Sequence, residues 1–164
     1  MIRTAIITLS DKGSKGERED ESGMVIREMV STIGADVRHY EVLPDERPRI
    51  AAALARLADS GVIDLIITTG GTGVAPRDVT PEATRDVIDR ELPGMAEAMR
   101  AESFKKTAHA MLSRAVAGIR KQTLIVNLPG SPRAVRENLA VILPALSHAV
   151  EKIMGDPSDC ARLS

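Results

Sequence analysis

The chain has 164 residues, of which 43% are apolar, and its formal net charge at neutral pH is −1. A chain of this length is expected to form one domain and to bury about 70% of the surface that its unfolded form exposes. With one Tyr, one Phe, no Trp and scattered basic residues, it offers neither an aromatic platform for bases nor a positive surface for DNA or RNA.

The single cysteine, Cys160, excludes an intrachain disulfide and a thiolate metal cluster, which fits a reducing cytoplasm. Met1 leads directly into an apolar, β-branched stretch without the charged and apolar regions of a signal peptide. No apolar run approaches the length of a membrane span. We therefore expect a soluble protein that stays in the cytoplasm.

Predicted strands and helices alternate along the first half of the chain. Runs of apolar and β-branched residues predict strands over residues 3–8, 36–43 and 65–69. Apolar residues at helical spacing predict helices between them, over residues 22–33 and 46–60. Ser22 is the expected cap of the first helix and Gly34 its expected stop. The charged stretch 10–21 is expected to be a long exposed loop.

Helices and strands also follow each other in the second half. Thr80 as N-cap and Pro81 at the first helical position predict a helix to about Arg90. A further helix is expected over residues 95–104, and two strands over 115–119 and 123–127.

The C-terminal part is expected to be helical. Ser131 and Pro132 repeat the pattern of a capping residue followed by proline, and Pro144 is expected to divide the stretch into helices 132–143 and 145–154. Residues 1–154 then form a single domain, and residues 155–164 a frayed tail.

A glycine loop, Gly70-Gly71-Thr72-Gly73, follows the third predicted strand and precedes a helix start. Main-chain N–H groups that no side chain shields can bind an anion such as a phosphate, and a nearby helix N-terminus favours negative charge. The loop lacks the lysine of a P-loop and the glycine spacing of the dinucleotide fingerprint. It therefore predicts a phosphate site outside both familiar nucleotide motifs.

Alternating strands and helices indicate right-handed βαβ units and a mostly parallel sheet, whose ligand crevice lies outside the carboxyl ends of its strands. A second glycine turn, Pro129-Gly130-Ser131, also follows a predicted strand. We expect both glycine loops to border one crevice.

Two acids, Asp45 and Asp78, each lie just past a predicted strand or its loop and beside a helix start. Mg²⁺ prefers one or two carboxylates together with substrate phosphate oxygens, so the pair suits a magnesium–nucleotide site. The alternative for Asp45, which precedes Glu46, is helix capping alone. The alternative for Asp78 is the favourable charge of an acid near a helix N-terminus.

Other polar residues near the loops have two interpretations each. Arg77 can neutralise a phosphate or be a solvated loop arginine, and the hydroxyls of Thr72 and Ser113 can bind substrate or nearby main chain. The three histidines show no metal-ligand spacing, and no hydrolase or zinc-protease motif is present. A substrate phosphate is already an anion, so catalysis can rest on positioning and charge neutralisation alone.

Three motifs in order resemble those of the molybdopterin adenylyltransferases, the family that includes MogA, MoaB and the G domain of gephyrin. They are the stretch from Thr68 to Glu82, the run Met111-Leu112-Ser113-Arg114-Ala115, and the run from Asn127 to Pro132. The resemblance extends from the Ser10-Asp11 loop through Pro44-Asp45-Glu46 to the last helix.

The resemblance implies an α/β fold, a three-layer sandwich around a mixed, mainly parallel sheet with helices on both faces, and typically a homotrimer. It implies transfer of AMP from Mg-ATP to the terminal phosphate of molybdopterin, with release of pyrophosphate, and possible contact with the molybdate-insertion enzyme downstream. Neither a nucleic acid nor a membrane is an expected partner.

Carried over by motif, the catalytic and metal-binding acids are Asp45 and Asp78, with Mg²⁺ as cofactor. The substrate-binding residues implied by the resemblance are Gly70, Gly71, Thr72, Gly73, Arg77, Ser113, Asn127, Gly130 and Ser131. The residues implied to border the nucleotide are Ser10, Asp11 and Gly23.

Two other functions stay open. Some MoaB-type members lack the transferase activity, so a non-catalytic pterin-binding or scaffold trimer is one alternative; the intact stretch from Pro76 to Pro81 favours an active enzyme. The other is a nucleotide-processing domain that acts on a different phosphorylated substrate.

Overall fold

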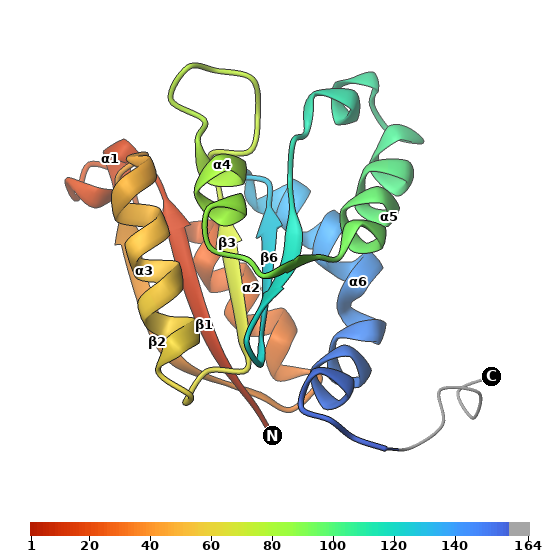
Figure 1. Cartoon of the computed structure of the whole chain (residues 1–164). Coiled ribbons are helices and arrows are strands. Elements are labelled where there is room, and N and C mark those ends of the chain that lie inside the picture. Colours follow the sequence, from red (N-terminus) through yellow and green to blue (C-terminus); the bar gives the residue numbers. More distant parts are fainter. Residues whose placement is uncertain (158–164) are drawn as a thin grey trace.

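The structure, a computed structural model, describes residues 1–157 and has one six-stranded sheet covered by helices (Figure 1). The strands are β1 (Ile2–Leu9), β2 (Ala35–Leu43), β3 (Leu65–Thr69), β4 (Arg90–Glu91), β5 (Ala117–Arg120) and β6 (Thr123–Leu128). The helices are α1 (Asp11–Ser14), α2 (Glu21–Ser31), α3 (Arg47–Asp59), α4 (Thr80–Arg85), α5 (Pro93–Phe104), the 3-10 helix η1 (Ala108–Leu112) and α6 (Pro132–Ile153).

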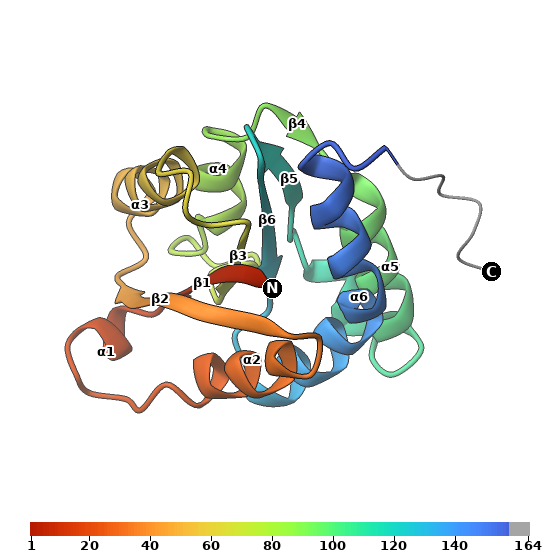
Figure 2. The ribbon, with the colours of Figure 1, turned by 90° about the horizontal axis from the view of Figure 1, so that it is seen from below.

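The sheet is mixed and mainly parallel, with strand order β2-β1-β3-β6-β5-β4. Strands β2, β1, β3 and β6 are parallel, and β5 is antiparallel to both β6 and β4. Helices α3 and α4 cover one face, and α2, α5 and α6 cover the other (Figure 2). The expected three-layer α/β fold is confirmed.

Alternate residues of the central strands supply two apolar cores, one on each face of the sheet. In β3, Leu65 and Ile67 pack with α2 and α6, whereas Ile66 packs with α3 and α4. All five residues of β3 are buried, as expected for a parallel strand with helices on both faces. The sheet is thus a rigid support for the loops at its edge.

The N-terminal helix starts differ from those expected. Residues 10–21 are not only loop, because Ser10 caps the short α1 by accepting a hydrogen bond from the Gly13 N–H at 3.0 Å. Asp20, and not Ser22, caps α2 by accepting from the Gly23 N–H at 3.0 Å. The Ser22 hydroxyl instead donates to the Gly130 carbonyl at 2.6 Å, a tertiary contact that local sequence does not reveal.

The region after the glycine loop was predicted incompletely. Helix α4 begins at Thr80 itself and ends at Arg85, so the expected extension to Arg90 is wrong. The chain turns at Asp89, whose N–H donates to the Ile119 carbonyl at 2.8 Å, and the next residues form β4 against β5. The expected strands 115–119 and 123–127 are found as β5 and β6, each with slightly shifted ends.

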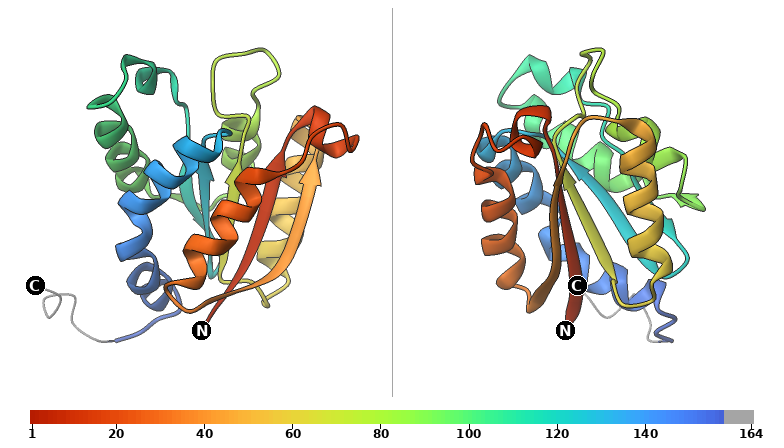
Figure 3. Two further views of the ribbon diagram at one scale, coloured as in Figure 1. Left: turned by 180° about the vertical axis from the view of Figure 1, so that it is seen from behind. Right: turned by 90° about the vertical axis from the view of Figure 1, so that its left-hand side faces the viewer.

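Helix α6 is continuous through Pro144, so the expected division into 132–143 and 145–154 is wrong. A proline inside a helix costs about 3 kcal/mol, because it removes one main-chain hydrogen bond and bends the helix. Buried Leu139, Ile142, Leu146 and Val150 lie on both sides of it, and each stabilises the packed helix by about 2 kcal/mol. Packing therefore outweighs the proline, and the α6 ribbon curves along the sheet (Figure 3).

The chain continues past α6 for the four residues Met154, Gly155, Asp156 and Pro157, and the rest of the expected tail, with Cys160, lies outside the described residues. Among the helices of residues 1–157, none combines the length and apolar character needed to cross a bilayer.

Candidate active site

Three strand ends meet at one edge of the sheet, at the top of Figure 1, where β1, β3 and β6 each lead into a loop. The Gly70 N–H donates to the Leu128 carbonyl at 3.1 Å, and the Thr69 hydroxyl donates to the Pro129 carbonyl at 2.7 Å. The two glycine loops are therefore bonded to each other, and the prediction that they border one crevice is confirmed.

The glycine loop has a main-chain shape that other residues do not readily adopt. Gly70 and Gly71 have φ angles of +96° and +67°. A Cβ on Gly70 would collide with the Leu9 carbonyl, and one on Gly71 would collide with the Thr80 hydroxyl. Thr80 fastens the loop, because its hydroxyl donates to the Gly70 carbonyl at 2.9 Å and its N–H donates to the Gly71 carbonyl at 3.1 Å.

A first pocket of about 590 Å³ opens between the loops that follow β1, β3 and β6. It brings together Ser10, Asp45, Gly70, Gly71, Asp78, Gly130 and Ser131 from the expected site residues. Asp20 and Ser22, at the start of α2, complete the wall on the β1 side. The pocket is the right size for a nucleotide or a similar small molecule.

A second pocket of about 470 Å³ lies on the other side of the glycine loop. It is lined by three more of the expected residues, Thr72, Gly73 and Ser113, together with polar residues of α5, η1 and α6. Gly71, Asp78, Gly130 and Ser131 line both pockets. Two small molecules bound there would therefore meet at a wall that carries a carboxylate and main-chain amides.

Asp45 lines the first pocket and is held by hydrogen bonds with Asp11. Its Oδ2 accepts from the Asp11 N–H at 3.2 Å, and its own N–H donates to Asp11 Oδ1 at 3.0 Å. Its Oδ1 is buried and has no hydrogen-bond partner among the described residues. Glu46, not Asp45, occupies the N-cap position of α3, so capping does not explain Asp45.

The charge of Asp45 is disfavoured in this setting. Burial raises the pKa of its carboxyl, and the neighbouring charges of Asp11 and Asp78 raise that pKa further. A cation bound next to the unpartnered, buried oxygen of Asp45 would stabilise the charged form of this carboxylate. No cluster of three or more possible metal ligands occurs within residues 1–157, so a divalent ion here would depend on oxygens of a bound phosphate.

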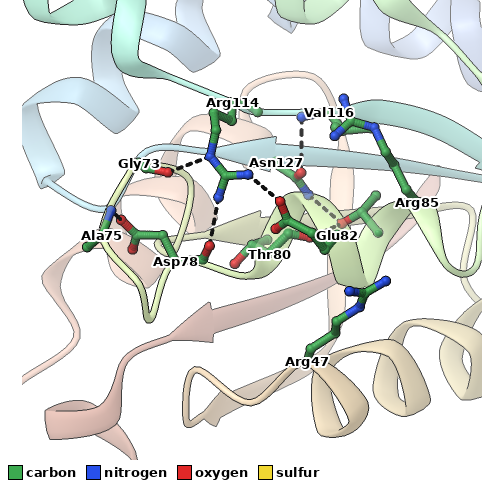
Figure 4. A network of polar contacts seen from close by, with 12 residues as sticks. Arg47, Gly73, Ala75, Asp78, Thr80, Glu82, Arg85, Arg114, Val116 and Asn127 are labelled. Carbon is green, nitrogen blue, oxygen red and sulfur yellow. Dashed lines mark hydrogen bonds and ion pairs between the residues drawn. The ribbon is translucent and has the colours of Figure 1, made fainter.

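Asp78 lies in the same connection between β3 and α4 as the glycine loop. Its Oδ2 accepts from the Ala75 N–H at 2.9 Å, and a Cβ on Gly73 would lie 2.8 Å from the same oxygen (Figure 4). Close approach of the Gly73 main chain therefore requires a glycine there.

Arg77 does not point into either pocket but pairs with Asp11. Its Nη2 and Nε donate to the two carboxylate oxygens at 2.7 and 3.0 Å, and this contact lowers the pKa of Asp11. The pair joins the start of α1 to the exposed segment that follows the glycine loop.

Two of the expected residues contact other parts of the protein. Asn127 is fully buried; its amide donates to the Thr68 and Thr84 hydroxyls and accepts from the Val116 N–H (Figure 4). The Gly23 N–H donates to Asp20 at 3.0 Å, and Gly23 lines neither pocket. Asn127 therefore fixes the strand under the glycine loop and lies outside the two pockets.

Asp20 is a pocket residue that the sequence did not single out. One carboxylate oxygen accepts from the Thr8 hydroxyl at 2.6 Å and from the Tyr40 hydroxyl, while the other caps α2. Burial, and then Asp20, raise the pKa of Tyr40 to about 12. An acid just before Glu21-Ser22-Gly23 is a capping signal that could have identified it.

A family model described as "Probable molybdopterin binding domain" matches residues 5–148. The chain belongs to this family. The matched range contains Asp45, Asp78 and both glycine loops, so every segment that lines the two pockets lies inside the molybdopterin-binding domain. The family resemblance drawn from the sequence motifs is confirmed.

Individual relatives agree with the family match. Molybdopterin adenylyltransferase of Helicobacter pylori strain J99 is 45% identical over 157 residues, or 94% of this chain and 89% of that protein. Gephyrin of Dictyostelium discoideum is 42% identical over 93% of this chain and 22% of its own length. The crystal structure of the molybdopterin biosynthesis enzyme MoaB from Thermus thermophilus superimposes with a TM-score of 0.90 at 52% identity, covering 97% of this chain and 100% of that one.

Proposed function

We propose that this protein is a molybdopterin adenylyltransferase of molybdenum cofactor biosynthesis, which transfers AMP from Mg-ATP to the terminal phosphate of molybdopterin. The observation that carries the proposal is the pair of pockets with a common wall of Gly71, Asp78, Gly130 and Ser131. A group transfer between two substrates requires such an arrangement, since the reacting atoms must lie within about 3.5 Å of each other.

The first pocket is the proposed nucleotide site, bordered by Ser10 and by the segment that contains Asp11 and Gly23. The second pocket, with Thr72, Gly73 and Ser113, is the proposed molybdopterin site. The N–H groups of the glycine loop would hold the terminal phosphate of the pterin. Arg77 becomes available to a phosphate if its pair with Asp11 opens.

In the proposed reaction, an oxygen of the terminal phosphate of molybdopterin attacks the α-phosphorus of ATP. The bond from that phosphorus to the oxygen that bridges to the β-phosphate breaks, and pyrophosphate leaves with the electron pair. The attacking phosphate is already an anion, so the reaction needs no general base and depends on positioning and charge neutralisation.

Asp45 and Asp78 are the proposed ligands of Mg²⁺, which would neutralise charge on the phosphate oxygens. The buried, unpartnered Oδ1 of Asp45 fits this role. We also propose that the protein acts as a homotrimer in the cytoplasm and supplies adenylylated pterin to a molybdate-insertion enzyme. Light scattering of the purified protein, with a mass three times that of one chain, tests the trimer.

The deciding experiment incubates purified protein with molybdopterin, ATP and Mg²⁺ and follows adenylylated pterin and pyrophosphate. The wild type should form both products in equal amounts, and Asp78→Asn should form neither while keeping the wild-type circular dichroism spectrum. Pterin binding without ATP consumption would instead identify a non-catalytic binding or scaffold protein. ATP consumption that does not depend on pterin would identify a different phosphorylated substrate.

A further inference from the structure

Arg114, between η1 and β5, donates hydrogen bonds from three nitrogens of its guanidinium group, two of them to main-chain carbonyls of residues 73–78 and the third to helix α4 (Figure 4). Nε donates to the Gly73 carbonyl and Nη2 to the Asp78 carbonyl, both at 2.7 Å, and Nη1 pairs with the Glu82 carboxylate. The Arg114 N–H donates to the Thr72 carbonyl at 2.8 Å. One residue therefore contacts the main chain of residues 72–78 at three points and α4 at a fourth.

These contacts hold together the two ends of an exposed main-chain segment, residues 74–77. Gly73 and Asp78 flank residues 74–77, which are exposed on the outer side of the loop. Within this segment, the Asp78 N–H donates to the Ala75 carbonyl, and the Ala75 N–H donates to the Asp78 carboxylate. The guanidinium group joins the two ends, so the place of the Asp78 carboxylate relative to Gly73 depends on Arg114.

Arginine has the geometry for this role. Its planar fork fixes the directions of its N–H groups, whereas the ammonium of a lysine can reach only part of three separated acceptors. Glu82, in the first turn of α4, holds the fork from the other side. Arg114 lowers the pKa of Glu82, so the pair stays charged at neutral pH.

We propose that Arg114 is a positioning residue for adenylyl transfer, which holds the Asp78 carboxylate and the Gly73 main chain at the wall between the two pockets. This inference rests on the proposed function. Arg114 itself lines neither pocket, so its effect must pass through the loop that it holds. It should therefore affect the rate of transfer more than the binding of nucleotide, whose other walls come from the β1–α2 segment.

The test compares Arg114→Ala and Arg114→Lys with Arg120→Ala. Arg120 is a matched control, because it also bonds to a carboxylate, that of Asp59, and to a main-chain carbonyl, that of Val87. It lies at the opposite edge of the sheet, next to the turn between β5 and β6. Both alanine variants lose similar contacts, but only one of them should change the site.

We expect Arg114→Ala to lower kcat about 100-fold, since a displacement of about 1 Å can have that effect. The dissociation constant of ATP, measured by calorimetry without pterin, should change by less than about threefold. Arg114→Lys should recover part of kcat, and guanidinium ion at a non-denaturing concentration should restore part of the activity of Arg114→Ala. Arg120→Ala should lower thermal stability and keep kcat.

An active wild type with an equally active Arg114→Ala variant would overturn this inference and leave the proposed function standing. A loss of activity in Arg114→Ala that merely follows its unfolded fraction, with no rescue by guanidinium, would also overturn it. A wild type that forms no product would overturn both.

Discussion

The close packing of the glycine loop can be tested by placing one methyl group in it, with Gly71→Ala. At this position φ is +67°, and the new Cβ would collide with the Thr80 hydroxyl and lie 2.9 Å from Asp45 Oδ1. The left-handed conformation costs an alanine about 1–2 kcal/mol, and a forced close contact costs about 1–3 kcal/mol. Together they amount to about 2–5 kcal/mol, a large part of the roughly 5–15 kcal/mol that stabilises a typical domain.

Gly61→Ala is the matched control, since Gly61 has a φ of +72° but nothing within 4 Å of an added Cβ. It should show only the conformational cost of about 1–2 kcal/mol. In a chain of this length each kcal/mol lowers the melting temperature by about 2–4 °C, so Gly71→Ala should melt roughly 4–20 °C below the wild type.

Thermal unfolding followed by circular dichroism measures both variants, and the adenylylation assay follows the site. Gly71→Ala should also lose transferase activity, because its methyl group displaces Asp45 or Thr80, whereas Gly61→Ala should remain active. Equal melting temperatures for the two variants, with normal activity of Gly71→Ala, would refute the close approach of loop, acid and threonine.

Two further predictions concern one half-buried and one buried carboxylate. Burial raises the pKa of the Asp45 carboxyl, so the native state binds its proton more tightly than the unfolded chain does and loses stability as pH rises through the raised pKa. Asp45→Asn should therefore melt at a higher temperature than the wild type at pH 7, and the difference should be smaller near pH 4. The variant should form no adenylylated product. The contacts with Arg3 lower the pKa of Asp64, so its stabilisation is present at neutral pH and lost as pH falls through the lowered pKa. Asp64→Asn should cost about 2 kcal/mol or more at pH 7 in urea unfolding, against less than about 0.5 kcal/mol for Asp36→Asn in the exposed pair with Arg38; equal costs would contradict the role of burial.

Local chemistry explains which parts of the site could be predicted from the sequence. Gly70 and Gly71 predict a turn, and Ser131 with Pro132 predicts a helix start, because turn and capping preferences depend on only a few neighbouring residues. The alternation of strands and helices predicted that both glycine loops lie at the same edge of the sheet.

The errors arose where a tertiary contact decides the outcome. Ser22 has the right chemistry for a cap, but its hydroxyl bonds to Gly130, more than a hundred positions away. The sequence also did not reveal that the Asn127 amide bonds to main-chain and hydroxyl groups inside the sheet. Strand β4 consists of two exposed charged residues and carries no pattern at all.

The walls of the first pocket come from segments about sixty positions apart, around Ser10, Gly70 and Gly130. Each wall is in place only when the neighbouring strands are paired, so the pocket depends on the pairing of β1, β3 and β6 together. A fragment that ends before β6 would lack one side of the pocket, whatever helices and strands it retained. Substrate binding should therefore stabilise the whole fold against unfolding and protect the central strands from hydrogen exchange, beyond the loops that the ligands touch.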